Sequence, residues 1–269
     1  MFAQCLFVRW AVVGATHQRT TPMKNSPDAH RKRQHAWAHA LAARVRTLWL
    51  TKMLGTSLSI AAFFPIYFWI MQATAYRAAR VPVSGLDALI GVQQWAIVPY
   101  ASLWLYVSMP AAFAANRQAL LTYASGALVM VVTAMFVYWM WPTYVEATGI
   151  DWSQYPLIQF LKSSDVGGNA FPSLHVAFAL FAARVLHSQL ASIQAPGWIR
   201  WVNGAWCLAI VYATLATRQH VLLDVAGGMV TAWVAVHWVA GAHKLLRAGV
   251  DEDPAAQRSS TGANSMRAR

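Results

Sequence analysis

The stretch "FPSLHVAFALFAAR", residues 171–184, places polar groups at the very start of an apolar segment. From Val176 onward the residues are apolar enough to enter lipid, yet Ser173 and His175 precede or begin that run, directly after Pro172. Proline suits the first turn of a helix. We therefore expect a membrane-spanning helix whose first turn carries a titratable imidazole. The role of that imidazole depends on which residues of the other segments lie near it.

The composition indicates a membrane protein. Of 269 residues, 58% are hydrophobic and 11% are charged, whereas soluble domains carry about a quarter charged residues. The net charge of +12 could indicate nucleic acid as a partner. However, the basic residues lie mainly at the two ends and beside apolar runs, as cytoplasmic anchors do. We therefore predict contact with membrane lipids and no nucleic-acid binding.

Six segments reach the roughly 17–25 mostly apolar residues that a membrane span requires. They comprise residues 53–72, 94–115, 119–141, 171–187, 198–217 and 221–242. A helix satisfies its own backbone in lipid, which an open sheet cannot do. The predicted fold class is therefore all-α, an integral membrane bundle of six transmembrane helices that forms one domain over residues 53–242.

Lysine and arginine residues predict the orientation, because cytoplasmic loops carry an excess of them. Residues 1–52 form a basic N-terminal tail, and residues 243–269 form a second tail that we expect to be disordered. Acidic residues accompany the basic ones in the opposite loops, around residues 73–93, 142–170 and 217–220. We expect both termini in the cytoplasm and these three loops outside an inner or plasma membrane.

The first residues do not resemble a secretory signal. The apolar run at residues 2–15 is interrupted by Arg9, and no clear cleavage site follows. This pattern favours a translation start at Met23 over a cleaved signal.

Ionisable residues gather at the outer end of the predicted bundle. His175 begins the fourth span, and the fifth ends close to Arg218, His220 and Asp224. His220 and Asp224 are four residues apart and would share one face of a helix. The carboxylate can then accept a hydrogen bond from one imidazole nitrogen and leave the other as an acceptor or nucleophile. Ionisable groups inside a membrane cost roughly 2.5–3.5 kcal/mol each, so this grouping indicates function.

Each of these residues also has a structural interpretation. His175 alone fits an interfacial anchor, Arg218 fits a topology anchor, and His220 with Asp224 fits a helix–helix pair. It is the joint pattern that favours a site. Phosphoryl chemistry suits it, because Gly168 permits an unusual backbone path before the fourth span. The N-terminus of that span then directs N–H groups toward an anion, and Ser173 adds a hydroxyl.

At these positions the sequence resembles the type 2 phosphatidic acid phosphatase superfamily of integral membrane lipid phosphatases and phosphotransferases. That family carries Pro-Ser-Gly-His and, later, Ser-Arg-x5-His-x3-Asp. The matching segments here are PSLH (172–175) and HVLLD (220–224). The resemblance covers the core at residues 53–242 and is specific at these two motifs.

The departures from the family pattern are informative. Leu174 replaces the glycine, Ala213 and Thr214 stand in place of Ser-Arg, and the upstream Lys-x6-Arg-Pro motif is absent. The sequence is more similar to the inositol phosphorylceramide synthase branch, which moves a phospho-headgroup between lipids. Transfer is thus as plausible as hydrolysis. Phosphatidic acid, a polyprenyl phosphate, a phosphoinositide and a ceramide acceptor all fit.

The resemblance implies a mechanism, and the predicted orientation places it at the outer membrane face. His220 would attack the lipid phosphorus to form a phosphohistidine, Asp224 would orient His220, and His175 would protonate the leaving oxygen. The phosphate would be bound by Ser173, Arg218, Gly168 and Lys162. The mechanism requires no metal and no cofactor, and the partner is a lipid phosphate. The oligomeric state stays open.

Two other classes of function remain as alternatives. A lipid transporter or flippase would also place polar groups in a bundle, but it typically has broken helices at mid-membrane and repeated halves. A non-catalytic membrane scaffold would not need two histidines and an aspartate at one depth. The sequence therefore favours a lipid phosphate phosphatase or phosphotransferase.

Overall fold

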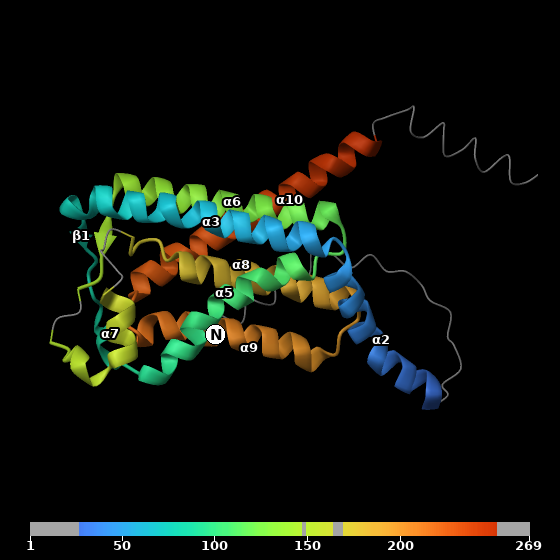
Figure 1. Cartoon of the computed structure of the whole chain (residues 1–269), viewed down its shortest axis with the longest axis horizontal. Helices are drawn as coiled ribbons and strands as arrows, with labels where there is room; N and C mark the ends of the chain where they lie inside the picture. The colour runs from blue at the N-terminus through green and yellow to red at the C-terminus, as the bar shows by residue number, and fades with distance from the viewer. Residues whose placement is uncertain (1–26, 147–148, 164–168, 252–269) are drawn as a thin grey trace, which may run out of the picture. The chain divides into compact units, whose positions relative to one another are not determined.

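A computed structural model of the chain describes residues 27–146, 149–163 and 169–251 (Figure 1). The chain divides into two units, Met1–Ala36 and Trp37–Arg269. Helix α2 (Pro27–Arg46) begins in the first unit and ends in the second, and all that follows concerns the second unit. Two positions from the sequence analysis, Met23 and Gly168, lie outside the described residues.

All six predicted spans are helical. They correspond to α3 (Trp49–Thr74), α5 (Ile97–Ala112), α6 (Arg117–Met140), α8 (Leu174–Ser192), α9 (Gly197–Ala216) and α10 (Leu222–Asp251). Within the described residues, five helices are long and apolar enough to cross a membrane: α3, α6, α8, α9 and α10. An all-α, multi-pass membrane bundle is therefore supported, whereas a count of six spans is not confirmed.

Helix α5 is the exception because it is short. Its 16 residues correspond to about 24 Å at a helical rise of 1.5 Å per residue, less than the ~30 Å hydrocarbon core of a bilayer. The predicted segment at 94–115 loses residues at both ends. The 3₁₀ turn η2 (Gln94–Ala96) precedes the helix. The helix ends at Ala112, and the Lys52 ammonium donates to the carbonyls of Ala112 and Ala114 there.

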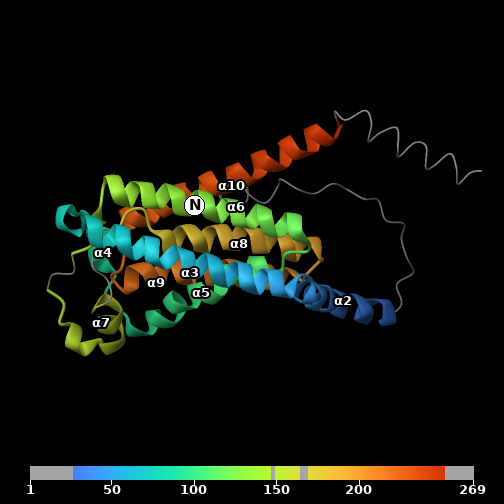
Figure 2. The same ribbon diagram turned by 45° about the horizontal axis from the view of Figure 1, so that its top comes forward.

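Helix α8 lies at the centre of the bundle and contacts α5, α6, α9 and α10 (Figures 1 and 2). Small, fully buried side chains make this close packing possible, notably Ala177, Ala179 and Ala182. Phe181 fills the space beside them, stacked on Tyr123 of α6. Helix α8 is therefore held by other helices on several sides.

Three connections meet at the end of the bundle where α8 and α10 begin. The first contains η1 (Ala75–Arg77), β1 (Ala79–Arg80) and α4 (Gly85–Leu89), the second contains β2 (Thr143–Tyr144), η3 (Trp152–Gln154) and α7 (Pro156–Ser163), and the third is the turn at residues 217–221. β1 and β2 pair in parallel, with Ala79 opposite Thr143. These are the three loops that the sequence predicts on one side of the membrane. We call this region the His220 end.

The opposite end of the bundle contains Lys52 together with the C-terminal residues of α5 and α8, and we call it the Lys52 end. Here α10 runs further than the sequence predicts. The helix continues to Asp251, so residues 243–251 of the expected disordered tail are helical, whereas residues 252–269 lie outside the described part. The segment "AHKLLRA" (242–248) consists mainly of good helix formers, which explains the continuation.

Candidate active site

The start of α8 lies directly against the start of α10. The backbone N–H of Ser173 donates to the carbonyl of Asp224 at 3.1 Å. Gly228 allows this approach, since a Cβ there would lie 2.5 Å from the Ser173 carbonyl oxygen. Ser173 is fully buried and its Oγ accepts from Val176 N at 3.3 Å, so it is the N-cap of α8. The two motifs are thereby joined.

His220 lies in the turn between α9 and α10. Arg218 ends the preceding helix with a left-handed φ of 56°, and the N–H groups of Gln219 and His220 then donate to the carbonyl of Thr214. The spacing in the sequence predicts His220 and Asp224 on one helical face. That placement is wrong in detail, because α10 begins only at Leu222. The two side chains nevertheless meet.

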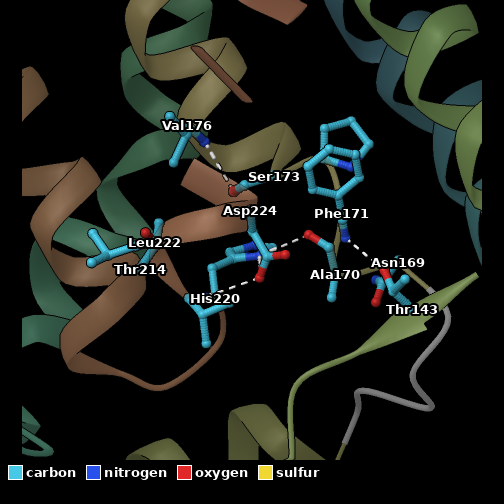
Figure 3. Close-up of polar contacts among 12 residues, drawn as sticks. Thr143, Asn169, Ala170, Phe171, Ser173, Val176, Thr214, His220, Leu222 and Asp224 are labelled. Atoms are coloured by element: carbon cyan, nitrogen blue, oxygen red, sulfur yellow. Dashed lines mark hydrogen bonds and ion pairs between the residues drawn. The ribbon is translucent and has the colours of Figure 1, made fainter. Parts of the chain in front are cut away.

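The Nδ1 atom of His220 has two oxygen neighbours (Figure 3). It lies 3.1 Å from the carbonyl oxygen of Ala170 and 3.5 Å from Asp224 Oδ2. The segment carrying Ala170 is itself fixed by Thr143, whose carbonyl and Oγ1 accept from Ala170 N and Phe171 N at 3.0 and 2.9 Å. Two acceptors at Nδ1 favour the tautomer that carries its proton there, and Nε2 then keeps its lone pair.

Asp224 is fully buried in the first turn of α10. Its Oδ2 also accepts from Val221 N at 2.9 Å, so the carboxylate ties the turn to the helix. Its Oδ1 has no hydrogen-bond partner among the described residues. A buried carboxylate oxygen without a partner is costly, and such groups occur at sites that bind or react.

His175 lies in the first turn of α8, with its ring centroid 6.0 Å from that of His220. It stacks on Tyr100 at 4.3 Å and meets Trp104 edge-on at 6.2 Å, and both aromatic residues belong to α5. Its Nε2 is buried without a hydrogen-bond partner in the described part of the chain. The structure thus brings the two histidines and Asp224 together at the His220 end.

The residues predicted to bind phosphate differ in their contacts. Lys162 of α7 donates to the carbonyl of Arg218 at 2.8 Å and lies over the Trp152 ring, so it supports the turn that carries Arg218. The Nε of Arg218 is buried without a partner among the described residues. Ser173 uses its Oγ as a helix cap. Gly168 lies outside the described residues.

Three residues that contact or support the cluster, Tyr100, Thr143 and Asp87, were not predicted from the sequence. Asp87 was detectable, because "SGLD" (84–87) is a capping box and acidic residues are rare in this chain. Burial alone would raise the pKa of the Asp87 carboxyl, but hydrogen bonds from Ser84 and Leu222 hold that pKa below its usual value. Asp87 is therefore ionised at neutral pH.

No group of three or more metal-ligating side chains lies together in the ranges that the structure describes. The polar groups present are the two imidazoles, the buried carboxylate of Asp224 with that of Asp87 nearby, and the Arg218 guanidinium. Such a set can perform nucleophilic and acid–base chemistry on an anionic group.

Comparison with known proteins supports the same chemistry. A family model described as the PAP2 superfamily matches residues 115–247, just under half of the chain, and this region includes both motifs. No curated protein and no solved structure matches the chain. With the five apolar helices, the family match supports a membrane enzyme of the type 2 phosphatidic acid phosphatase superfamily, whose members are phosphatases or phosphotransferases.

Proposed function

We propose that the protein hydrolyses or transfers the phosphate group of a membrane lipid through a covalent phosphohistidine at His220. The observation that carries this proposal is the environment of the His220 ring, which is 8% exposed. Its Nδ1 faces Ala170 O and Asp224 Oδ2 at 3.1 and 3.5 Å. With the proton held at Nδ1, the lone pair of Nε2 is the nucleophile.

In the first step, Nε2 of His220 forms a bond to phosphorus and the bond between phosphorus and the leaving oxygen breaks. His175 donates a proton to that oxygen, a role typically worth about 10²–10⁴ in rate. Asp224 stabilises the positive charge that develops on the His220 ring. The 6.0 Å between the ring centroids is compatible with both imidazoles contacting one phosphoryl group.

In the second step, a hydroxyl group attacks the phosphohistidine and His175 takes its proton. Attack by water releases phosphate, and attack by a lipid hydroxyl transfers the phosphoryl or phospho-headgroup unit to a new lipid. The resemblance of "FPSLH" and "TRQHVLLDVAGG" (171–175 and 217–228) to the inositol phosphorylceramide synthase branch supports the second outcome. Both outcomes share the same covalent intermediate.

Arg218 is the first candidate for binding the phosphate oxygens. Its unpartnered Nε and its position two residues before His220 support this role. Lys162 acts through Arg218, because its ammonium already donates to the Arg218 carbonyl at 2.8 Å. We retain Ser173 and Gly168 as further ligands from the family resemblance, through a hydroxyl and a backbone amide.

Purified protein in lipid nanodiscs tests the reaction directly. Phosphatidic acid, a polyprenyl diphosphate and a phosphoinositide are supplied with and without ceramide or diacylglycerol as acceptor. Release of phosphate indicates hydrolysis, and a new phospholipid indicates transfer. A substrate labelled at phosphorus should leave an acid-labile, base-stable label on the protein, absent from His220→Ala. Turnover by the wild type with a label that survives in His220→Ala would refute the phosphohistidine.

We also propose that the His220 end faces outward. Leu89 and Phe160 are 81% and 76% exposed at this end, and Ala191 is exposed near the Lys52 end. In a background with Cys5→Ser, single cysteines at 89 and 160 should react with an impermeant thiol reagent on intact cells, and one at 191 should not. Cys207 is buried and should not react, so the protein without an added cysteine gives the background signal. Labelling at 191 alone would place the site in the cytoplasm.

A further inference from the structure

Asp87 is a buried carboxylate outside the two sequence motifs. It lies in the connection between α3 and α5 and is 3% exposed. Its Oδ2 accepts from Ser84 N at 2.8 Å and from Ser84 Oγ at 2.6 Å, which closes the capping box of α4. Its Oδ1 accepts from the backbone N–H of Leu222 at 2.8 Å. Asp87 therefore links two segments that are far apart in sequence.

Leu222 is the first residue of α10, where backbone N–H groups have no partner within the helix. The preceding backbone N–H, that of Val221, donates to Asp224 Oδ2 at 2.9 Å. Two successive donors at this terminus are thus accepted by two carboxylates, one from α10 itself and one from the α3–α5 connection. Leu222 lies midway between His220 and Asp224 in the sequence, so its position affects both side chains.

Further contacts hold the same connection against the turn that carries His220. Gln93 N donates to the carbonyl of Ala216 at 3.0 Å, and Ile90 packs beside Val176, Leu215 and Val225. Asp87 is also within electrostatic reach of Arg218, whose positive charge it attracts. Of the three residues of this connection, Asp87, Ile90 and Gln93, only Asp87 contributes a charge, and hydrogen bonds to charged groups are about twice as strong as neutral ones.

We propose that Asp87 is a positioning residue for the His220–Asp224 pair, an inference that rests on the function proposed above. By holding Leu222 N, it fixes the first turn of α10 and with it the distance between the imidazole and its carboxylate. Asp87 does not touch the reacting atoms. Its loss should slow the chemical step, because misplacement by about 1 Å can cost on the order of 10²-fold in rate.

Asp151 provides a matched control. It accepts from Ser153 N, Ser153 Oγ and Gln154 Nε2 at 3.1, 2.7 and 3.1 Å, a local pattern similar to that of Asp87 with Ser84. These partners all lie within three residues of Asp151, whereas Asp87 also bonds Leu222, 135 residues away. Asp151 is exposed, whereas Asp87 is buried. If Asp87 acts only as a local cap, Asp87→Asn should leave the start of α10 unchanged, as Asp151→Asn should.

The test compares kcat and KM on the lipid phosphate that the wild type turns over fastest. Asp87→Asn should lower kcat roughly 10- to 100-fold with KM changed less than about threefold. Asp151→Asn should stay within about twofold of the wild type. Unchanged kcat in folded Asp87→Asn, or an equal loss in Asp151→Asn, would overturn the proposal.

A double-mutant cycle identifies the bond itself. Leu222→Pro removes the donor that Asp87 accepts, and proline is compatible with the first position of a helix. Asp87→Asn should lower kcat much less in the Leu222→Pro background than in the wild type. If Asp87→Asn does not fold, Leu222→Pro alone should still reduce kcat about tenfold or more. Additive losses in the cycle would show that Asp87 acts by another route.

Amide hydrogen exchange separates this proposal from the proposed reaction. In Asp87→Asn, peptides covering residues 221–226 should exchange at least about tenfold faster than in the wild type, because the first turn of α10 opens more often. Asp151→Asn should show no change there. A wild type inactive on every lipid phosphate would refute the reaction, while exchange would still decide the role of Asp87. Unchanged exchange in Asp87→Asn would refute that role.

Discussion

The two ends of the bundle use buried charges in opposite ways. At the Lys52 end, the Lys52 ammonium donates to the carbonyls of Arg44, Ala112 and Ala114 at 2.6, 2.9 and 2.8 Å. Arg44 donates to the carbonyl of Gln189 at 3.2 Å. Cations thus bind the carbonyls at helix C-termini. At the His220 end, Asp224 and Asp87 accept from Val221 N and Leu222 N at a helix N-terminus. Both arrangements oppose the helix dipole.

The ends differ in what remains unsatisfied. Lys52 has three donors and all three are used. At the His220 end, His175 Nε2, Arg218 Nε and Asp224 Oδ1 lack partners among the described residues. The Lys52 end also has such atoms, Gln189 Oε1 and Arg200 Nε, but neither belongs to the buried ion that joins its helices. A saturated charge indicates a structural role, whereas unsatisfied groups around a histidine pair indicate chemistry.

The largest expected effect is at His220. His220→Ala removes the proposed nucleophile and should reduce turnover by at least about 10³-fold, to the rate at which the lipid reacts without protein. Phosphate release should be measured on protein whose thermal unfolding midpoint is unchanged. Substantial turnover in well-folded His220→Ala would contradict the assignment of the His220 end as the catalytic end.

Asp224→Asn should have the next largest effect. The amide oxygen can still accept from Val221 N, so the first turn of α10 should persist, but the charge that supports the His220 ring is lost. We expect kcat to fall on the order of 10²–10⁴-fold. Steady-state kinetics with a parallel unfolding curve measure this. If unfolding of the variant accounts for the whole loss of kcat, Asp224 acts only as a helix cap.

The effect of His175→Ala should depend on the leaving group. An alkyl lipid phosphate needs a proton on its leaving oxygen and should lose about 10²–10⁴ in rate. An aryl phosphate leaves readily without one and should lose much less. The ratio of the two losses is the measurement. Equal losses would make His175 a phosphate ligand instead of the general acid.

Lys52→Met should have the smallest effect on turnover and a clear effect on stability. The variant keeps the length of the side chain but leaves three carbonyls without their donor, and each unsatisfied buried group costs about 1–3 kcal/mol. The unfolding midpoint should fall, while kcat of the folded fraction stays within about twofold. A tenfold loss of kcat at an unchanged midpoint would contradict the assignment of the Lys52 end as structural.

The helices and the histidine cluster were predictable from side chains alone. Apolar runs of span length locate α3, α6, α8, α9 and α10, and the motifs locate His175, His220 and Asp224. The partners that orient these groups were not predictable in the same way. The nearest neighbour of His220 Nδ1 is the carbonyl of Ala170, and any residue type could supply a carbonyl. The end of α5 was missed for a related reason, since the carbonyl of its last residue, Ala112, accepts from Lys52, 60 residues earlier in the chain.

The contact at Gly228 sets how much sequence variation α10 can tolerate. A Cβ at 228 would lie 2.5 Å from the Ser173 carbonyl oxygen, a backbone atom that cannot rotate away, whereas a Cβ at Gly241 of the same helix meets nothing within 4 Å. In a saturation library selected for activity, position 228 should therefore return glycine alone and position 241 many residue types. The two glycines, 13 positions apart on one helix, thus differ in whether another residue can replace them.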